Sequence, residues 1–136
     1  MNVSEFMTSN PACCGPSDTM KSAAVLMVDN DCGEIPVVDE DGCLLGVVTD
    51  RDIACRGVAE GVAPDASVSE VMSDGIITVK PDESMESCCT KMEENQVRRL
   101  PVVDEKGKCC GMVAQADIAQ TANEGATGEL VREVSV

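Results

Sequence analysis

Thr49 and Asp52 have the side-chain types and the spacing of a small-molecule site. They lie three positions apart at the expected start of a helix, so both side chains can face one ligand. A carboxylate only accepts hydrogen bonds and can take the protons of two neighbouring hydroxyls, while a threonine hydroxyl can donate one. The helix N-terminus favours an anion, and Arg51 adds positive charge. The alternative is that Thr49, Asp50 and Asp52 only cap the helix, which is the commoner case for an isolated pair of this kind.

Cysteine is the second residue type that could carry chemistry, with nine copies in 136 residues. An odd count without a secretion signal argues against a disulfide framework. Zinc sites favour Cys-x2-Cys spacing and histidine, whereas this chain has no histidine and adjacent residues point to different faces. The adjacent pairs are Cys13-Cys14, Cys88-Cys89 and Cys109-Cys110. We predict reduced thiols that bind no metal, with a thiol or metal sensor as the less favoured alternative.

Catalysis finds little support in the sequence. There is no histidine, no glycine-rich phosphate loop and no serine with an adjacent base. The chain is therefore predicted not to be an enzyme, and no residue is assigned a catalytic role.

Charge and hydropathy narrow the partners further. A formal net charge of −15 repels nucleic acid phosphates, so no nucleic acid partner is expected. No run of eighteen apolar residues is present, so no membrane span is expected either. The first ten residues show neither a basic nor an apolar region of a signal peptide, which predicts a cytoplasmic protein.

An internal repeat with a constant step is the strongest pattern. Val3-Ser4-Glu5 returns at 68–70, and Pro36-Val37-Val38-Asp39-Glu40 returns at 101–105, which is the same displacement. The register needs no gap between Val3 and Ala54. A single copy has too little core to be stable alone, so two copies are expected to pair and bury their remaining apolar faces. We assign residues 1–66 to the first copy, 67–122 to the second and 123–136 to a C-terminal tail.

Each copy is predicted to fold as strand, helix, strand, strand, helix, which is an α/β (α+β) class. The segments Pro16-Ser17-Asp18-Thr19 and Pro81-Asp82-Glu83-Ser84 each place a hydroxyl before a helical run, as an N-cap requires. Apolar residues then recur at helical spacing from Met20 to Met27 and from Met85 to Met92. Two apolar strands follow, joined by polar turns that end in glycine. The strands are 35–38 and 44–49 in the first copy, and 100–103 and 109–114 in the second; second helices start near residues 50 and 115.

The segment from Gly46 to Ile53, which reads Gly-Val-Val-Thr-Asp-Arg-Asp-Ile after a Pro-Val-Val-Asp strand, resembles the cystathionine-β-synthase (CBS) domain motif. The segment from Gly111 to Ile118 is similar but lacks the threonine. The resemblance covers roughly residues 3–122. It implies a stand-alone, pseudo-twofold pair of the Bateman type, with clefts between its motifs for AMP, ADP, ATP, S-adenosylmethionine or NAD-type ligands. It also implies a homodimer that regulates a protein partner.

The resemblance favours Asp52 as a ribose-binding residue rather than only a cap. In the second copy Asp117 keeps the carboxylate, but Ala114 and Ala116 remove the hydroxyl and the cation. Arg98 and Arg99 could contact phosphate instead, with solvated surface arginines as an equally weighted alternative. Four apolar positions are expected to flank an adenine ring while forming ordinary core: Ile35, Val37, Leu100 and Val102.

Two further functions stay open at this point. The leading alternative is a ligand-free dimeric module whose surface regulates a partner protein, and the other is the thiol or metal sensor. Titration with adenosine nucleotides distinguishes the ligand-free interaction module from a ligand-sensing module. The content of bound metal tests the thiol or metal sensor.

Overall fold

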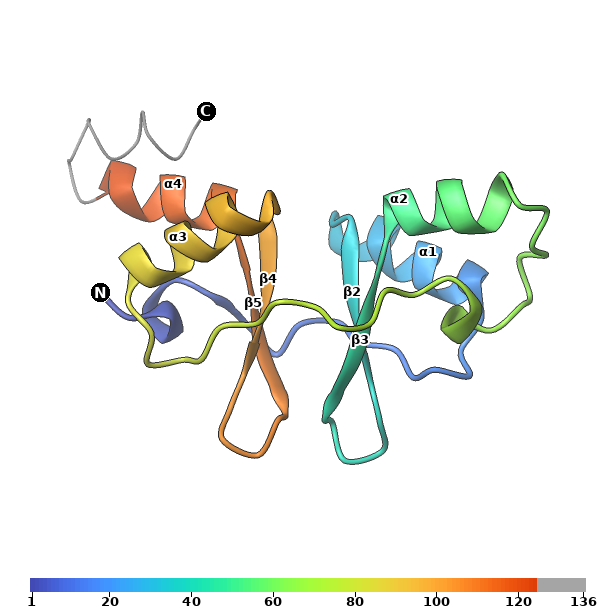
Figure 1. Ribbon diagram of the computed structural model, residues 1–136, viewed down its shortest axis with the longest axis horizontal. Coiled ribbons are helices and arrows are strands. Elements are labelled where there is room, and N and C mark those ends of the chain that lie inside the picture. The colour runs from blue at the N-terminus through green and yellow to red at the C-terminus, as the bar shows by residue number, and fades with distance from the viewer. Residues whose placement is uncertain (125–136) are drawn as a thin grey trace. The chain divides into compact units, whose positions relative to one another are not determined.

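The structure, a computed structural model, describes residues 1–124 and divides the chain into two units. Among the described residues, unit 1 contains Met1–Asn10, Ile77–Glu105 and residues 110–124, and unit 2 contains Pro11–Ile76 and Lys106–Cys109. Most of the expected C-terminal tail (residues 125–136) lies outside the described residues. Each unit combines a β-hairpin with helices, as the sequence predicted (Figure 1).

Unit 2 holds the helices and hairpin of the first copy. Its strands β2 and β3 pair antiparallel, and the turn between them uses Gly42 at a φ of 85°, a left-handed conformation that glycine tolerates. The π-helix η2 directly continues α2. The elements are α1 (Met20–Asn30), β2 (Glu34–Val38), β3 (Leu44–Thr49), α2 (Asp50–Asp52), η2 (Ile53–Val58) and the 3-10 helix η3 (Val68–Glu70).

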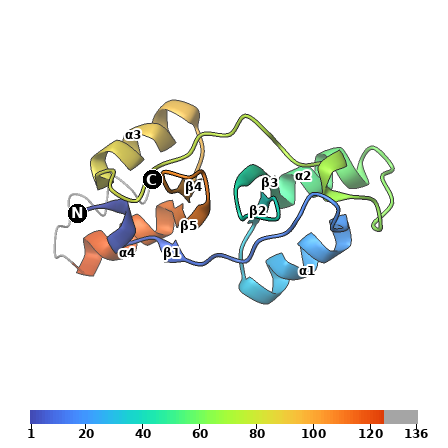
Figure 2. The same ribbon diagram turned by 90° about the horizontal axis from the view of Figure 1, so that it is seen from below.

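Unit 1 repeats this arrangement with the second copy. The turn glycine Gly107 has a φ of 82°, matching Gly42. A three-stranded sheet has the order β1-β5-β4, and Figure 2 shows β1 beside β5. The elements are η1 (Val3–Glu5), β1 (Thr8–Ser9), α3 (Met85–Asn95), β4 (Arg99–Val103), β5 (Cys109–Ala114, whose first residue is grouped with unit 2) and α4 (Gln115–Glu124).

The predicted N-caps are present in both units. Thr19 Oγ1 accepts the backbone N–H of Ser22 at 3.0 Å, and Ser84 Oγ accepts that of Ser87 at 3.0 Å. Both helices are followed by a C-cap residue in the left-handed conformation, Asp31 after α1 and its counterpart Gln96 after α3. The two copies thus begin and end their first helices in the same way, at equivalent positions of the repeat.

The opening segment of each copy packs with the helices of the other copy. Val3 N–H donates to the Glu83 carbonyl at 2.8 Å, and at the equivalent place Val68 N–H donates to the Asp18 carbonyl at 2.7 Å. The repeat itself did not predict this exchange.

The residues that follow these opening segments are exchanged in the same way. Thr8 in β1 lies opposite Met112 in β5, and Ser73 lies opposite Val47 in β3. Each second strand of a hairpin therefore gains a neighbour from the other copy, inside one unit.

Each unit has its own apolar core of small and branched side chains. The predicted helix faces are inside, since Met20, Ala23, Met27, Cys88 and Met92 are all buried. Packing of such aliphatic side chains at native density replaces the aromatic residues that the chain largely lacks. Within the described residues, no helix has the length and apolar character needed to span a membrane.

Candidate functional site

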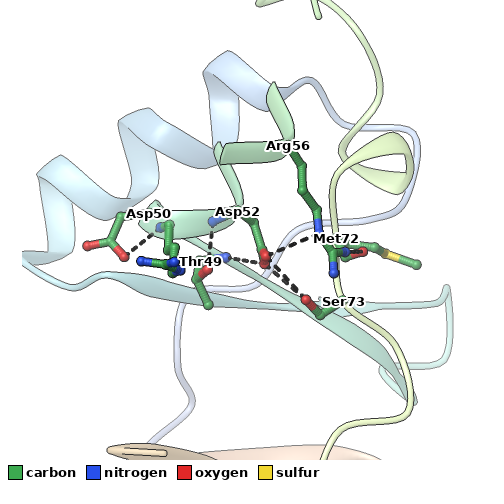
Figure 3. Close-up of polar contacts among 7 residues, drawn as sticks. Thr49, Asp50, Asp52, Arg56, Met72 and Ser73 are labelled. Carbon is green, nitrogen blue, oxygen red and sulfur yellow. Dashed lines mark hydrogen bonds and ion pairs between the residues drawn. The ribbon is translucent and has the colours of Figure 1, made fainter. Parts of the chain in front are cut away.

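Asp52 stands where β3 passes directly into α2 (Figure 3). Its Oδ2 accepts the backbone N–H of Thr49 at 3.0 Å, and Thr49 Oγ1 accepts the backbone N–H of Asp52 at 2.9 Å. This reciprocal pair satisfies two backbone donors at the start of the helix. The capping role considered from the sequence is therefore present, and Asp52 is only 9% exposed.

Two side chains that the sequence reasoning did not include also hold this carboxylate. Ser73 Oγ lies 3.2 Å from Asp52 Oδ1 and 3.3 Å from Oδ2, and Arg56 Nε lies 3.9 Å from Oδ1. Arg56 also donates from its guanidinium to the Met72 carbonyl at 3.1 Å. Arg56 follows Asp52 by four residues, a spacing that could have indicated the contact. Ser73 carries no such local signal.

Asp117 occupies the equivalent place in unit 1, where β5 passes into α4. Its Oδ2 accepts the backbone N–H of Ala114 at 2.8 Å, which repeats half of the pair seen in unit 2. Among the side chains of residues 1–121, no second polar partner of this carboxylate is found. A carboxylate has about four acceptor positions, and this bond uses one of them.

The expected cations are placed differently in the two units. Arg51 is exposed, and its backbone N–H donates to Asp50 Oδ1 at 2.8 Å. Across the hairpin, the residue opposite Thr49 is the acidic Glu34. The start of β2 therefore adds negative charge beside the Asp52 site.

In unit 1 the start of β4 has the opposite sign. Arg98 and Arg99 are exposed, and the Arg98 carbonyl accepts the backbone N–H of Gln115, the first residue of α4, at 2.8 Å. The matching bond in unit 2 runs from Asp50 N–H to the Gly33 carbonyl at 2.9 Å. The backbone thus places two arginines next to the helix N-terminus that carries Asp117.

The four apolar positions expected beside an adenine ring lie in the two cores. Ile35 and Leu100 are 1% exposed, and Val37 and Val102 are fully buried. A ring could reach these side chains only through a local opening of the core. Their core role is observed, and their contact with a ligand stays a prediction.

The thiols do not gather into a metal centre in the part of the chain that the structure describes. All nine cysteines are thiols rather than disulfides. Burial raises the pKa of Cys14 to about 11 and that of Cys88 to about 12, with neighbouring negative groups adding to the effect. These two side chains behave as small core residues.

Comparison with known proteins decides the family. The sequence profile described as "CBS domain" matches residues 3–56 and 68–124, which is most of the chain. This chain belongs to the CBS domain family. It is 42% identical over 131 residues to the CBS domain-containing protein YhcV of Bacillus subtilis, covering 95% of this chain and 92% of the relative. The predicted resemblance and the mixed α/β fold class are both confirmed.

Solved structures of CBS pairs share the fold and differ in what they hold. A pair from the protein MJ0100, with 5-methylthioadenosine and S-adenosylmethionine, has a TM-score of 0.83 at 26% identity, covering 92% of this chain and 98% of that one. CBSX2 with AMP has a TM-score of 0.82 at 26% identity, covering 93% and 98%. Hypoxic Response Protein I, with two coordinated zinc ions, has a TM-score of 0.82 at 36% identity, covering 88% and 98%.

Proposed function

We propose that this CBS pair is a regulatory module that binds adenosine-type ligands at the Asp52 and Asp117 positions. The observation that carries the proposal is the repeated carboxylate, placed at a strand-to-helix junction and fixed by one backbone N–H in each unit. There it can accept ribose hydroxyl protons while the helix N-terminus favours an anionic group. CBS pairs of the same fold that hold AMP or S-adenosylmethionine support this choice of ligand class.

The two positions are proposed to prefer ligands of different charge. Arg98 and Arg99 beside the start of α4 suit a phosphate, so the Asp117 position is expected to take AMP or ATP. Glu34 opposite Thr49 repels a phosphate, so the Asp52 position is expected to take a ligand with less negative charge, such as S-adenosylmethionine. NAD, with its two bridging phosphates, belongs with the first group.

Isothermal titration calorimetry with AMP, ATP, NAD and S-adenosylmethionine tests the proposal. The variants are Asp117→Asn and Asp52→Asn, whose amide oxygens can still accept the backbone N–H, and Asp50→Asn is the exposed control. Loss of a charged hydrogen bond to ribose costs roughly 1.5–3 kcal/mol, so the affected ligand should bind at least about tenfold more weakly. Asp117→Asn should weaken AMP, and Asp52→Asn should weaken S-adenosylmethionine.

The results can contradict the proposal at two levels. If the wild type binds an adenosine ligand and neither variant weakens it, the sites are misassigned. If the wild type binds none of the four ligands, the ligand-sensing function is wrong and the interaction module becomes the better account.

A homodimer is part of the proposal and has its own supporting observation. Val25 and Val28 lie three residues apart on α1 and are 47% and 80% exposed, and Val58 on η2 is 69% exposed. Isolated apolar residues are common on surfaces, but neighbours on one helix face suit a protein contact, either with a second copy or with a regulated partner. Sedimentation should show a dimer that Val28→Lys converts to a monomer; a monomeric wild type at high micromolar concentration would contradict it.

A cytoplasmic location also belongs to the proposal. A reducing compartment keeps cysteines as thiols, and all nine cysteines of this chain are thiols in the structure.

A further inference from the structure

Cys13 and Cys109 come together in unit 2 although they are far apart in the sequence. The antiparallel register of β1 with β5 ends with Ser9 opposite Gly111, and Asn10 N–H then donates to the Cys110 carbonyl at 3.2 Å. The segment that follows β1 therefore runs on from Asn10 toward Cys13, in the direction of Cys109 on the neighbouring strand. The Cys13 thiol turns back to donate to the Pro11 carbonyl at 3.2 Å, and it is also hydrogen-bonded to the Cys109 side chain.

Cys13 differs chemically from the buried cysteines. Its hydrogen bond with Cys109 lowers the pKa of the Cys13 thiol, although partial burial opposes this. Burial raises the pKa of Cys14, Cys88 and Cys110. Because the thiolate is the nucleophile, Cys13 is more reactive toward an oxidant than these three.

The surroundings of the two side chains also suit a reaction. Both Cys13 and Cys109 are half-buried, so a small oxidant can reach them, and neither belongs to the two core clusters. The neighbouring Cys14 is 4% exposed and packs in the core of unit 2. Cys109 is therefore better placed than the adjacent cysteine to act as the partner of Cys13.

We propose that Cys13 and Cys109 form a reversible disulfide when the protein meets hydrogen peroxide. The Cys13 thiolate attacks one peroxide oxygen and the O–O bond breaks. Hydroxide departs as the leaving group, and Cys13 becomes a sulfenic acid. The Cys109 thiol sulfur then attacks the Cys13 sulfur, the S–O bond breaks, and the hydroxyl leaves as water with the thiol proton. Peroxide is reduced and the two thiols are oxidised; a dithiol reductant reverses the bond.

The disulfide would join two stretches that are already tied to the β2–β3 hairpin. Cys14, next to Cys13, donates its N–H to the Pro36 carbonyl at 3.0 Å, and Cys109 donates its N–H to the Gly42 carbonyl at 3.0 Å. A covalent link between positions 13 and 109 closes a long loop of the chain and removes conformations from the unfolded state. Oxidation is thereby expected to stabilise unit 2 and to give the module a redox input that does not depend on ligand binding.

The experiment treats the full-length protein with peroxide and follows it by intact mass and peptide mapping. The wild type should lose the mass of two hydrogen atoms, regain it with dithiothreitol, and yield one cross-linked peptide pair containing Cys13 and Cys109. Its melting temperature should rise by about 5–15 °C on oxidation. Cys55→Ser, which changes an exposed cysteine outside the pair, should behave like the wild type.

Variants of the pair separate the two chemical steps. Cys109→Ser should accumulate a sulfenic acid on Cys13 that dimedone traps, and Cys13→Ser should slow oxidation at least tenfold. Cys43 is the matched alternative partner, because its thiol donates to the Lys106 carbonyl at 3.5 Å in the same unit. A disulfide from Cys13 to Cys43, a disulfide between two protein copies, or undiminished disulfide formation in Cys109→Ser would each overturn the proposal.

Discussion

Asp52 and Asp117 occupy the same place in two copies of one sequence pattern, yet their surroundings differ. Asp52 is held by Thr49 N–H, the Ser73 hydroxyl and the more distant Arg56 guanidinium. Asp117 is held by Ala114 N–H. The repeat has preserved the backbone geometry of the junction while the side chains around it have diverged. Equivalent carboxylates can therefore be held by different sets of neighbours while they keep the same place at the junction.

The largest expected loss of stability in this comparison concerns the glycines of the hairpin strands. A Cβ at Gly46 would overlap the Ser73 carbonyl oxygen, which is backbone and cannot rotate away. A Cβ at the equivalent Gly111 would overlap the flexible Met7 side chain and lie 3.0 Å from the Thr8 carbonyl. Gly46→Ala should cost about 3 kcal/mol and Gly111→Ala about 1–2 kcal/mol in urea unfolding. If the two substitutions lower the free energy of unfolding equally, the segments at Ser73 and at Met7–Thr8 accommodate a Cβ equally well, and the expected difference is wrong.

Smaller losses of stability are expected when the two carboxylates are removed. Asp52→Ala leaves the Thr49 N–H and the Ser73 hydroxyl without their acceptor in a buried place, so it should cost about 2–3 kcal/mol. Asp117→Ala removes one observed hydrogen bond of a half-buried side chain and should cost about 1 kcal/mol. Ser73→Ala, measured beside them by chemical denaturation, should cost about 1 kcal/mol. If Asp117→Ala proves the more damaging change, the ranking of the two junctions is wrong.

The smallest expected effect is a dependence of stability on pH. It arises from the Glu83–Lys91 ion pair of unit 1, which has no counterpart at the equivalent positions of unit 2. Glu83 Oε1 lies 3.0 Å from Lys91 Nζ, whereas Leu26 stands at the position equivalent to Lys91. Partial burial opposes ionisation of Glu83, but hydrogen bonds from the Lys80 backbone, Lys91 and Ser87, with the charge of Lys91, outweigh it. Together they lower the pKa of Glu83 below its usual value of 4.5.

The sign of the pH effect follows from this lowered pKa. Ionised Glu83 stabilises the folded state above the unfolded pKa, and this contribution disappears as the pH falls through the folded pKa. Glu83→Gln should therefore lower the melting temperature by a few degrees at neutral pH and converge with the wild type in acid. Melting curves between about pH 7 and pH 3 measure this. Asp18→Asn, at the equivalent position, should show a smaller neutral-pH difference; an equal one would rule out the Lys91 pair as the cause.

The sequence by itself determined the repeat, its constant step and, to within one residue, the ends of the four hairpin strands. It located Asp52 and Asp117 at strand-to-helix junctions, and it predicted a capping hydroxyl before the first helix of each copy, which the structure shows to be Thr19 and Ser84. These features depend on local rules, namely apolar spacing, capping hydroxyls and glycine turns, which act over a few residues. Both copies obey the same rules, so one pattern could be checked against the other.

Only the tertiary structure decided which copy each opening segment packs against. A repeat shows that two segments are alike, but a segment can satisfy the same hydrogen bonds on either copy. The exchange places the Ser73 hydroxyl against the Asp52 carboxylate. The segment that follows β1 places Cys13 within hydrogen-bonding distance of Cys109. These contacts join residues that are distant in the sequence, and no local spacing encodes them. They depend on how the chain closes around each core, because that alone sets which distant side chains meet.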